Sequence, residues 1–220
     1  VAPEGTLVVL RHYLYEYDGF FINESKNIYF ESVNLYTCPG MGVRAYTTEN
    51  MYFNRFNVKL KPQTDRLMSV TADALHFIDC YGDLKVTNSL FENCGDDALN
   101  SHGAYLQITA IDDNYSFSAI NPRSYNFMPN IGDKLEVNNR TDLTLVQELT
   151  VKSVEKLLTG GFKITCEEQI GDNVEIGHVV GNATKVTKLR FINNIVRNKR
   201  CRGVLVQSRD TIIENNTFVI

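Results

Sequence analysis

Residues 27–30 read Asn27-Ile28-Tyr29-Phe30, and 23 positions later residues 50–53 read Asn50-Met51-Tyr52-Phe53. Asn88-Ser89-Leu90-Phe91 is echoed in the same way by Asn215-Asn216-Thr217-Phe218. In each copy a short apolar run is followed by Asn, Gly or Asp, and then by a second run that opens on a small residue. Self-similarity at a fixed period is the signature of a repeat architecture. The chain is therefore expected to be a series of stacked repeats.

The small residue that opens one run of each repeat aligns the repeats with one another. Successive small residues are 23, 32, 24 and 105 positions apart. An interval of 32 is one repeat with a short extra loop, for which residues 61–65 have a suitable composition. An interval of 105 requires one repeat and a whole inserted domain. The small residues are Gly19, Gly42, Ala74, Ala98 and Gly203.

Each small residue is followed by apolar and polar side chains that alternate over four or five positions, which is typical of a half-buried strand. Stacked strand–turn coils that bury apolar side chains in a common interior form a solenoid. The sequence therefore predicts an all-β fold, a right-handed parallel β-helix. A β-sandwich is the weaker alternative, because sandwiches do not keep a 23-residue register.

The inserted domain is expected to cover residues 104–187, between β-helix coils at 1–103 and 188–220. It contains alternating segments such as 105–109 and 162–166, which predict a small antiparallel β-barrel or sandwich. Coils are visible up to the last residue, and an uncapped solenoid end exposes apolar surface. We therefore expect the protein to continue on both sides of this sequence.

Composition limits the classes of partner. The 220 residues carry a net charge of −4, which argues against a nucleic-acid partner because such proteins show a clustered basic excess. No run approaches the ~18 consecutive apolar residues of a membrane span, so no membrane partner is expected. The five cysteines include no CxxC pair. Cys38 and Cys94 fall at the same repeat position two coils apart, about 9.6 Å at ~4.8 Å per coil, which is too far for a disulfide.

The position just before the small residue carries acids. Asp73 and Asp97 occupy this position on successive coils, and Asp96 adds a third acid. Carboxylates on neighbouring strands lie about 4.8 Å apart. Such a group is costly unless it binds a cation, shares a proton or meets solvent. Acids in solenoid turns that cap backbone amides or bind calcium are the alternative interpretation.

Close carboxylates can divide the two tasks of a glycosidase. Their pKa values separate, which leaves one acid protonated and another ionised. A glycosidase needs one acid to protonate the leaving oxygen and one base or nucleophile on the other side of the sugar. The spacing of Asp73 from Asp96 or Asp97 leaves both retention and inversion open.

Two motifs resemble a known enzyme family. Thr71-Ala72-Asp73-Ala74-Leu75-His76-Phe77 and Gly95-Asp96-Asp97-Ala98-Leu99-Asn100-Ser101-His102-Gly103 resemble the active-site region of glycoside hydrolase family 110, the α-1,3-galactosidases. The resemblance extends to residues 8–12, 39–42 and 65–66, and to a barrel inserted after His102-Gly103. It covers nearly the whole chain, but only the middle of the family's length.

The resemblance implies an inverting hydrolase without metal or cofactor that acts on a glycan with terminal α-galactose. It implies Asp73 as general acid, with Asp96 and Asp97 holding and activating the water. It also implies that six residues contact galactose: Arg11, His12, Arg66, His76, Asn100 and His102. For the three histidines, a structural hydrogen-bonding role is the alternative. Ser101 stands where an apolar residue is expected.

Other interpretations remain. A polygalacturonase-like β-helix hydrolase also has an Asp, an Asp-Asp pair and a His-Gly, but with the His-Gly a full coil later and an Arg-x-Lys that Cys201-Arg202-Gly203-Val204 does not provide. Arg44, Arg66 and Arg202 are too few basic residues to favour a polysaccharide lyase. A non-catalytic carbohydrate-binding β-helix adhesin is the alternative outside the enzymes. By family resemblance alone we expect a secreted or periplasmic bacterial enzyme, and an oligomer is compatible with the sequence.

Overall fold

The computed structural model describes residues 2–13, 15–123, 128–158 and 160–219. These residues form an all-β protein that divides into two compact units. The first unit comprises Val1–His102 with Thr187–Ile220, and the second is Gly103–Val186, so each border falls one residue before the predicted one. Among the described residues, no helix is long and apolar enough to cross a membrane.

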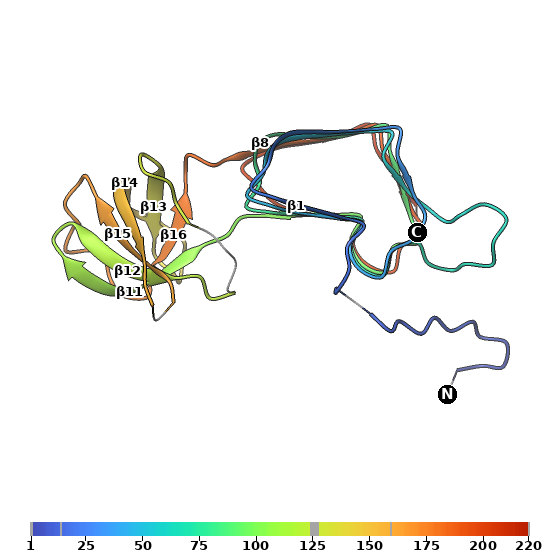
Figure 1. Cartoon of the computed structure of the whole chain (residues 1–220), viewed down its shortest axis with the longest axis horizontal. Coiled ribbons are helices and arrows are strands. Elements are labelled where there is room, and N and C mark those ends of the chain that lie inside the picture. Colours follow the sequence, from blue (N-terminus) through green and yellow to red (C-terminus); the bar gives the residue numbers. More distant parts are fainter. Residues whose placement is uncertain (1, 14, 124–127, 159, 220) are drawn as a thin grey trace. The chain divides into compact units, whose positions relative to one another are not determined.

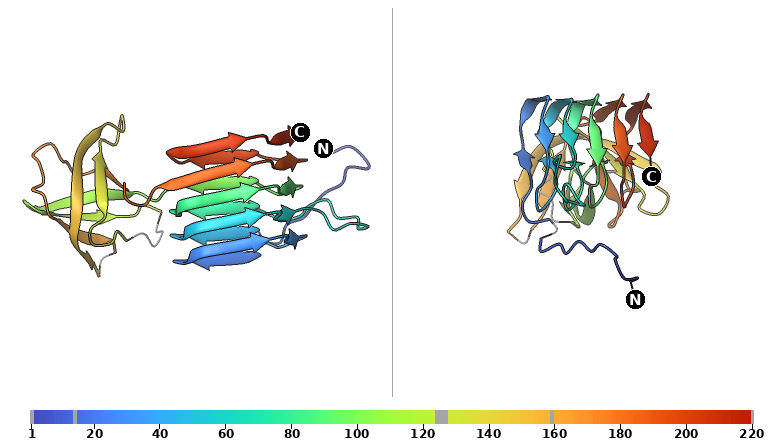
Figure 2. Two further views of the ribbon diagram at one scale, coloured as in Figure 1. Left: turned by 90° about the horizontal axis from the view of Figure 1, so that it is seen from above. Right: turned by 90° about the vertical axis from the view of Figure 1, so that its right-hand side faces the viewer.

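The first unit is a parallel β-helix of five coils, each of which contributes one strand to each of three sheets (Figures 1 and 2). The first sheet consists of β1 (Phe20–Asn23), β4 (Val43–Tyr46), β7 (Leu75–Ile78), β10 (Leu99–His102) and β19 (Val204–Gln207). The second consists of β2 (Lys26–Glu31), β5 (Glu49–Asn54), β8 (Tyr81–Thr87), β17 (Thr187–Ile192) and β20 (Asp210–Glu214). The third consists of β3 (Asn34–Leu35), β6 (Asn57–Val58), β9 (Leu90–Glu92), β18 (Ile195–Arg197) and β21 (Thr217–Val219).

The strand register confirms the alignment of small residues. Leu75 pairs with Val43 on one side and with Leu99 on the other, and Leu99 pairs with Val204. The insertion therefore lies inside the fourth coil, between β10 and β17, and the chain re-enters the stack without losing a position. The extra residues of the 32-residue interval form an exposed loop around Lys61, also as predicted.

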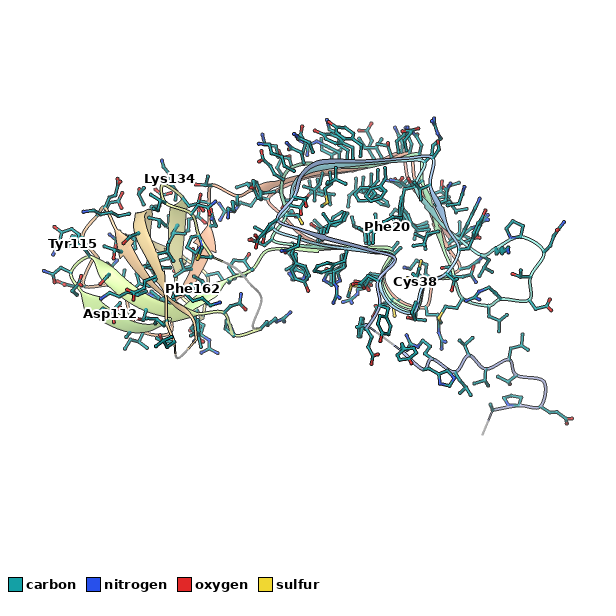
Figure 3. All side chains as sticks on the ribbon, viewed as in Figure 1. Phe20, Cys38, Asp112, Tyr115, Lys134 and Phe162 are labelled. Carbon is teal, nitrogen blue, oxygen red and sulfur yellow. The ribbon has the colours of Figure 1, made fainter. Side chains whose placement is uncertain are left out.

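The interior of the coils is filled by aligned apolar side chains. At the first coil Phe20 is partly exposed, but its ring points inward (Figure 3) and meets those of Phe30 and Phe56 edge to face. Phe53 stacks between Phe30 and Phe77 with ring centroids 4.9 and 5.6 Å away. Offset stacks of this kind add to the free energy of apolar burial. Cys38 and Cys94 are free and flank Val70 of the coil between them, which confirms that they lie two coils apart.

The second unit is a closed antiparallel barrel, which settles the choice between barrel and sandwich. Its apolar interior includes Leu106, Phe117 and Ile164. Its strands follow the order β11-β12-β15-β14-β13-β16 around the barrel: β11 (Leu106–Asp113), β12 (Ser116–Ile120), β15 (Phe162–Cys166), β14 (Leu145–Lys156), β13 (Lys134–Asn138) and β16 (Val179–Asn182).

Candidate active site

Three carboxylates meet at the corner where the chain passes from the third sheet to the first. The backbone carbonyls of Asp73 and Asp97 accept hydrogen bonds from the residues at the small-residue position of the preceding coil, which places both acids at equivalent positions on neighbouring coils. One oxygen of each of Asp73, Asp96 and Asp97 lies within 4.8 Å of the others. Asp73 and Asp97 are buried, whereas Asp96 is partly exposed.

A bend at the small residue brings these acids to the same side as polar strand residues. In a strand, side chains alternate between faces, so residues three positions apart point in opposite directions. Asp73 and His76 are three apart, yet Oδ2 of Asp73 lies 2.5 Å from Nδ1 of His76. The backbone therefore changes direction around Ala74 before β7 begins.

Two cationic side chains from beyond the insertion lie against the acids. Nε of Arg202 donates a hydrogen bond to Oδ1 of Asp97 at 3.0 Å. Lys199 donates through Nζ to the backbone carbonyl of Asp96. Burial lowers the pKa of Lys199, although the neighbouring carboxylates act in the opposite direction. The chain thus supplies positive charge to a site that would otherwise concentrate negative charge.

Asp97 is the acid whose protonation is most clearly affected by its surroundings. Burial raises the pKa of Asp97 above its ordinary value, and the hydrogen bond from Arg202 opposes this effect. Its second oxygen, Oδ2, is buried without a hydrogen-bond partner among the described residues. Asp97 is therefore a carboxyl group that binds protons more strongly than usual and has one buried oxygen that no described residue satisfies.

The segment before β1 reaches the acids. The guanidinium of Arg11 donates to the backbone carbonyl of Thr71 at 2.7 Å. The hydroxyl of Tyr15 donates to Oδ2 of Asp96 at 3.2 Å. Burial raises the pKa of Tyr15, and the Asp96 carboxylate raises it further, so the phenol remains a donor.

The remaining predicted residues divide into those near the acids and those apart from them. Nε2 of His76 lies 3.2 Å from Nε2 of His102. Asn100 sits beside His76 in β10, and its Oδ1 is buried without a partner among the described residues. Arg66 instead donates to Oγ1 of Thr37 on an exposed loop. His12 is exposed, and no hydrogen bond joins it to the described part of the chain.

Sequence reasoning did not single out Tyr15 or Lys199, or assign Arg202 a part in the site. A signal for Arg202 was present, because it occupies the position before the small residue on the coil after Asp97. Tyr15 precedes the first coil and Lys199 lies in an irregular corner, so neither falls in the repeated strand pattern. Buried Ser101, whose Oγ lies 3.5 Å from Oγ of Ser208, has a polar neighbour at the position expected to be apolar.

Carboxylates this close can share a proton or surround a cation. The described residues Asp73, Asp96 and Asp97 are the ones that could hold a metal ion here. Arg202 and Lys199 already provide positive charge, however, and the raised pKa of Asp97 favours retention of a proton. The arrangement is thus suited to moving protons between water and a ligand oxygen.

Curated proteins that are similar to this chain carry the name alpha-1,3-galactosidase. The chain is 32% identical over 97% of its length to a protein named alpha-1,3-galactosidase B from Phocaeicola vulgatus. It is 30% identical over 99% of its length to one of the same name from Akkermansia muciniphila, and 27% identical over 97% to alpha-1,3-galactosidase A from Bacteroides fragilis. No protein-family model matches the chain. The chain spans 38%, 28% and 36% of the lengths of these three relatives, all of which carry a galactosidase name.

Proposed function

We propose that this chain carries the acid–base residues of an exo-acting, inverting glycoside hydrolase that removes terminal α-1,3-linked galactose from glycans. The observation that carries the proposal is the convergence of Asp73, Asp96 and Asp97 within 4.8 Å at one corner of the β-helix. The names of the relatives support galactose as the sugar. No metal or cofactor is part of the proposed reaction.

The hydrogen bonds around the three acids support a division of labour. Asp73 accepts from the backbone N–H of Asp97 at 3.3 Å and lies 2.5 Å from a ring nitrogen of His76. These two contacts engage both oxygens of Asp73 and hold its side chain in a fixed orientation. We therefore assign Asp73 to the base that takes a proton from the attacking water.

Asp97 and Asp96 are assigned to hold the attacking water and to protonate the glycosidic oxygen, respectively. Oδ2 of Asp97 has no hydrogen-bond partner among the described residues, so we assign Asp97 to hold the attacking water beside Asp73. Asp96 is the partly exposed acid of the three, so it can meet the glycosidic oxygen and donate a proton to it. This division differs from the one implied by the family resemblance, in which Asp73 is the acid.

Asn100 is the best supported contact for the sugar, because a buried amide oxygen without a partner is costly until a hydroxyl donates to it. Arg11 and His12 of the segment before β1 are proposed as further contacts, since Arg11 is anchored beside the acids. Arg66 lies on the exposed loop and is the weaker assignment. As the resemblance alone suggests, we also propose that the bacterial enzyme is secreted or periplasmic.

Release of galactose from an α-1,3-linked galactoside tests the proposal, with the protein in the full length that its gene encodes. Asp73→Asn and Asp97→Asn are expected to lower the rate at least a hundredfold, as removal of an acid–base group does. Asp83→Asn, which changes a partly exposed acid on β8, is the matched control. Unchanged release by both site variants would contradict the catalytic assignment, and binding without turnover by the unaltered protein would favour a carbohydrate-binding adhesin.

Leaving-group chemistry tests the division of labour. An activated aryl α-galactoside needs little protonation, so Asp96→Asn should regain much of its rate on this substrate, whereas Asp73→Asn should not. The opposite result would assign the acid to Asp73. NMR detection of β-galactose as the first anomer released would confirm inversion, and α-galactose would exclude it.

A further inference from the structure

Asp73, His76 and His102 form a continuous line of contacts that leads away from the acids. Oδ2 of Asp73 lies 2.5 Å from Nδ1 of His76, and Nε2 of His76 lies 3.2 Å from Nε2 of His102. The two imidazole rings meet edge to face at 86°, with centroids 5.2 Å apart. Both nitrogens of His76 are therefore engaged by the protein itself, which leaves neither for a sugar hydroxyl.

Counting protons along this line assigns the donors. Each contact needs one proton, and a neutral imidazole carries a proton on only one of its two nitrogens. We place the proton of the first contact on Nδ1 of a neutral His76, because both oxygens of Asp73 then accept, as Oδ1 does from the backbone N–H of Asp97. Nε2 of His76 then has only a lone pair, so the proton of the second contact must come from Nε2 of His102.

We propose that His76 and His102 are positioning residues for Asp73: His102 donates to His76 and thereby fixes the tautomer whose Nδ1–H orients the side chain of Asp73. The hydrogen bond at one ring nitrogen determines which tautomer the other presents. The consequence for catalysis rests on the proposed function, in which Asp73 is the base. The contact between His76 and His102 is independent of the proposed function.

The charged neighbours of His76 are compatible with this arrangement. On the preceding coil, Arg44 of β4 pairs with His76 in the strand register, but its guanidinium binds Asp18 at 2.6 Å. On the following coil, the neutral Asn100 pairs with His76. The carboxylates of Asp96 and Asp97 lie beside Asp73, where Arg202 offsets part of their charge. Asp73 is thus the anion that directly contacts the ring.

Substitutions that preserve or remove one donor separate positioning from sugar binding. In His102→Gln the side-chain amide nitrogen can replace Nε2, so kcat should remain within about threefold. In His102→Leu that donor is lost, so kcat should fall roughly ten- to a hundredfold with little change in KM. His76→Asn can replace Nδ1 and should retain more activity than His76→Gln. An increase in KM alone in both His102 variants would instead make His102 a sugar ligand and overturn the proposal.

NMR can determine the tautomers of His76 and His102 in the absence of substrate. The sequence contains only four histidines, so their ring ¹⁵N signals can be assigned by substitution. We expect a protonated Nδ1 on His76 and a protonated Nε2 on His102. In His102→Leu, we expect His76 no longer to be restricted to the tautomer with the proton on Nδ1. Buried His178 is an internal reference, because its Nδ1 accepts from the backbone N–H of Glu175.

The two readouts distinguish the two ideas. Expected tautomers in a protein that releases no galactose would support the positioning pair and contradict the proposed function. A protonated Nε2 on His76 of the unaltered protein, or a tautomer unaffected by His102→Leu, would overturn the positioning pair even if galactose is released.

Discussion

Nε of Arg202 donates to Oδ1 of Asp97 at 3.0 Å, although 105 residues separate the two in sequence. The contact exists because the chain leaves the fourth coil after β10, forms the barrel, and returns in register at β17 and β19. The acids come from before the insertion, and Arg202 and Lys199 come from after it. The charge balance of the site therefore depends on the return of the chain to the stack.

Asp97→Asn should stabilise the protein at neutral pH. The pKa of Asp97 is raised in the folded state, so the folded protein holds a proton that the unfolded protein has released. Stability therefore falls as the pH rises above the ordinary value of 3.8, and the ionised group is a cost at pH 7. The melting temperature of Asp97→Asn should exceed that of the unaltered protein at pH 7, and the difference should disappear near pH 3.

Arg202→Met also tests the charge of Asp97, but with the opposite expected change in stability. It removes the donor that lowers the pKa of Asp97, so it should destabilise the protein at pH 7 and have little effect near pH 3. A melting-temperature difference of equal size at both pH values would show that Asp97 does not act through its charge.

The sequence predicts the coils well because a repeat leaves few choices. Once Gly42, Ala74 and Ala98 are aligned, the pairing of every strand in the first sheet follows, and with it the approach of Asp73 to Asp97. Tyr15 could not be found in this way because it precedes the first coil. The contact between His76 and His102 depends on side-chain rotamers across a diagonal of the sheet, which strand alternation does not determine.

Tyr15→Phe should reduce activity roughly tenfold or more, because it removes a hydrogen bond of 3.2 Å to the carboxylate of Asp96. The effect should appear in kcat, since Asp96 is the proposed acid. Tyr13→Phe is the matched control, because the Tyr13 ring packs edge to face on Tyr17 and keeps that contact without its hydroxyl. Equal rates for both variants would exclude Tyr15 from the site.

Gly95→Ala should separate the coils beneath the acids. A Cβ at Gly95 would lie 2.2 Å from the backbone oxygen of Thr71, which cannot move without disturbing the neighbouring coil. Overpacking of this kind costs about 1–3 kcal/mol, and the displacement would pass directly to Asp96. Urea unfolding and galactose release should both be affected. Gly103→Ala is the control, because its nearest contact would be an ordinary 3.7 Å, and equal losses in the two variants would contradict the explanation.

Asn194→Ala tests the hydrogen bonds made by one buried side chain at the corner between β17 and β18. The buried side chain of Asn194 accepts from the backbone N–H of Ser89 at 2.9 Å and donates to the carbonyl of Val86 at 2.9 Å. Alanine would leave both backbone groups buried and unpaired, and each such group costs about 1–3 kcal/mol. The free energy of unfolding in urea should therefore fall by about 2–6 kcal/mol.

The matched control for Asn194→Ala is Lys188→Ala, which changes an exposed residue on β17 of the same coil. It should leave the urea midpoint nearly unchanged, because a surface substitution of this kind stays within about 0.5 kcal/mol. A loss below about 1 kcal/mol in Asn194→Ala would mean that water replaces the amide at the corner. The side chain of Asn194 would then add little to the contact between the third and fourth coils.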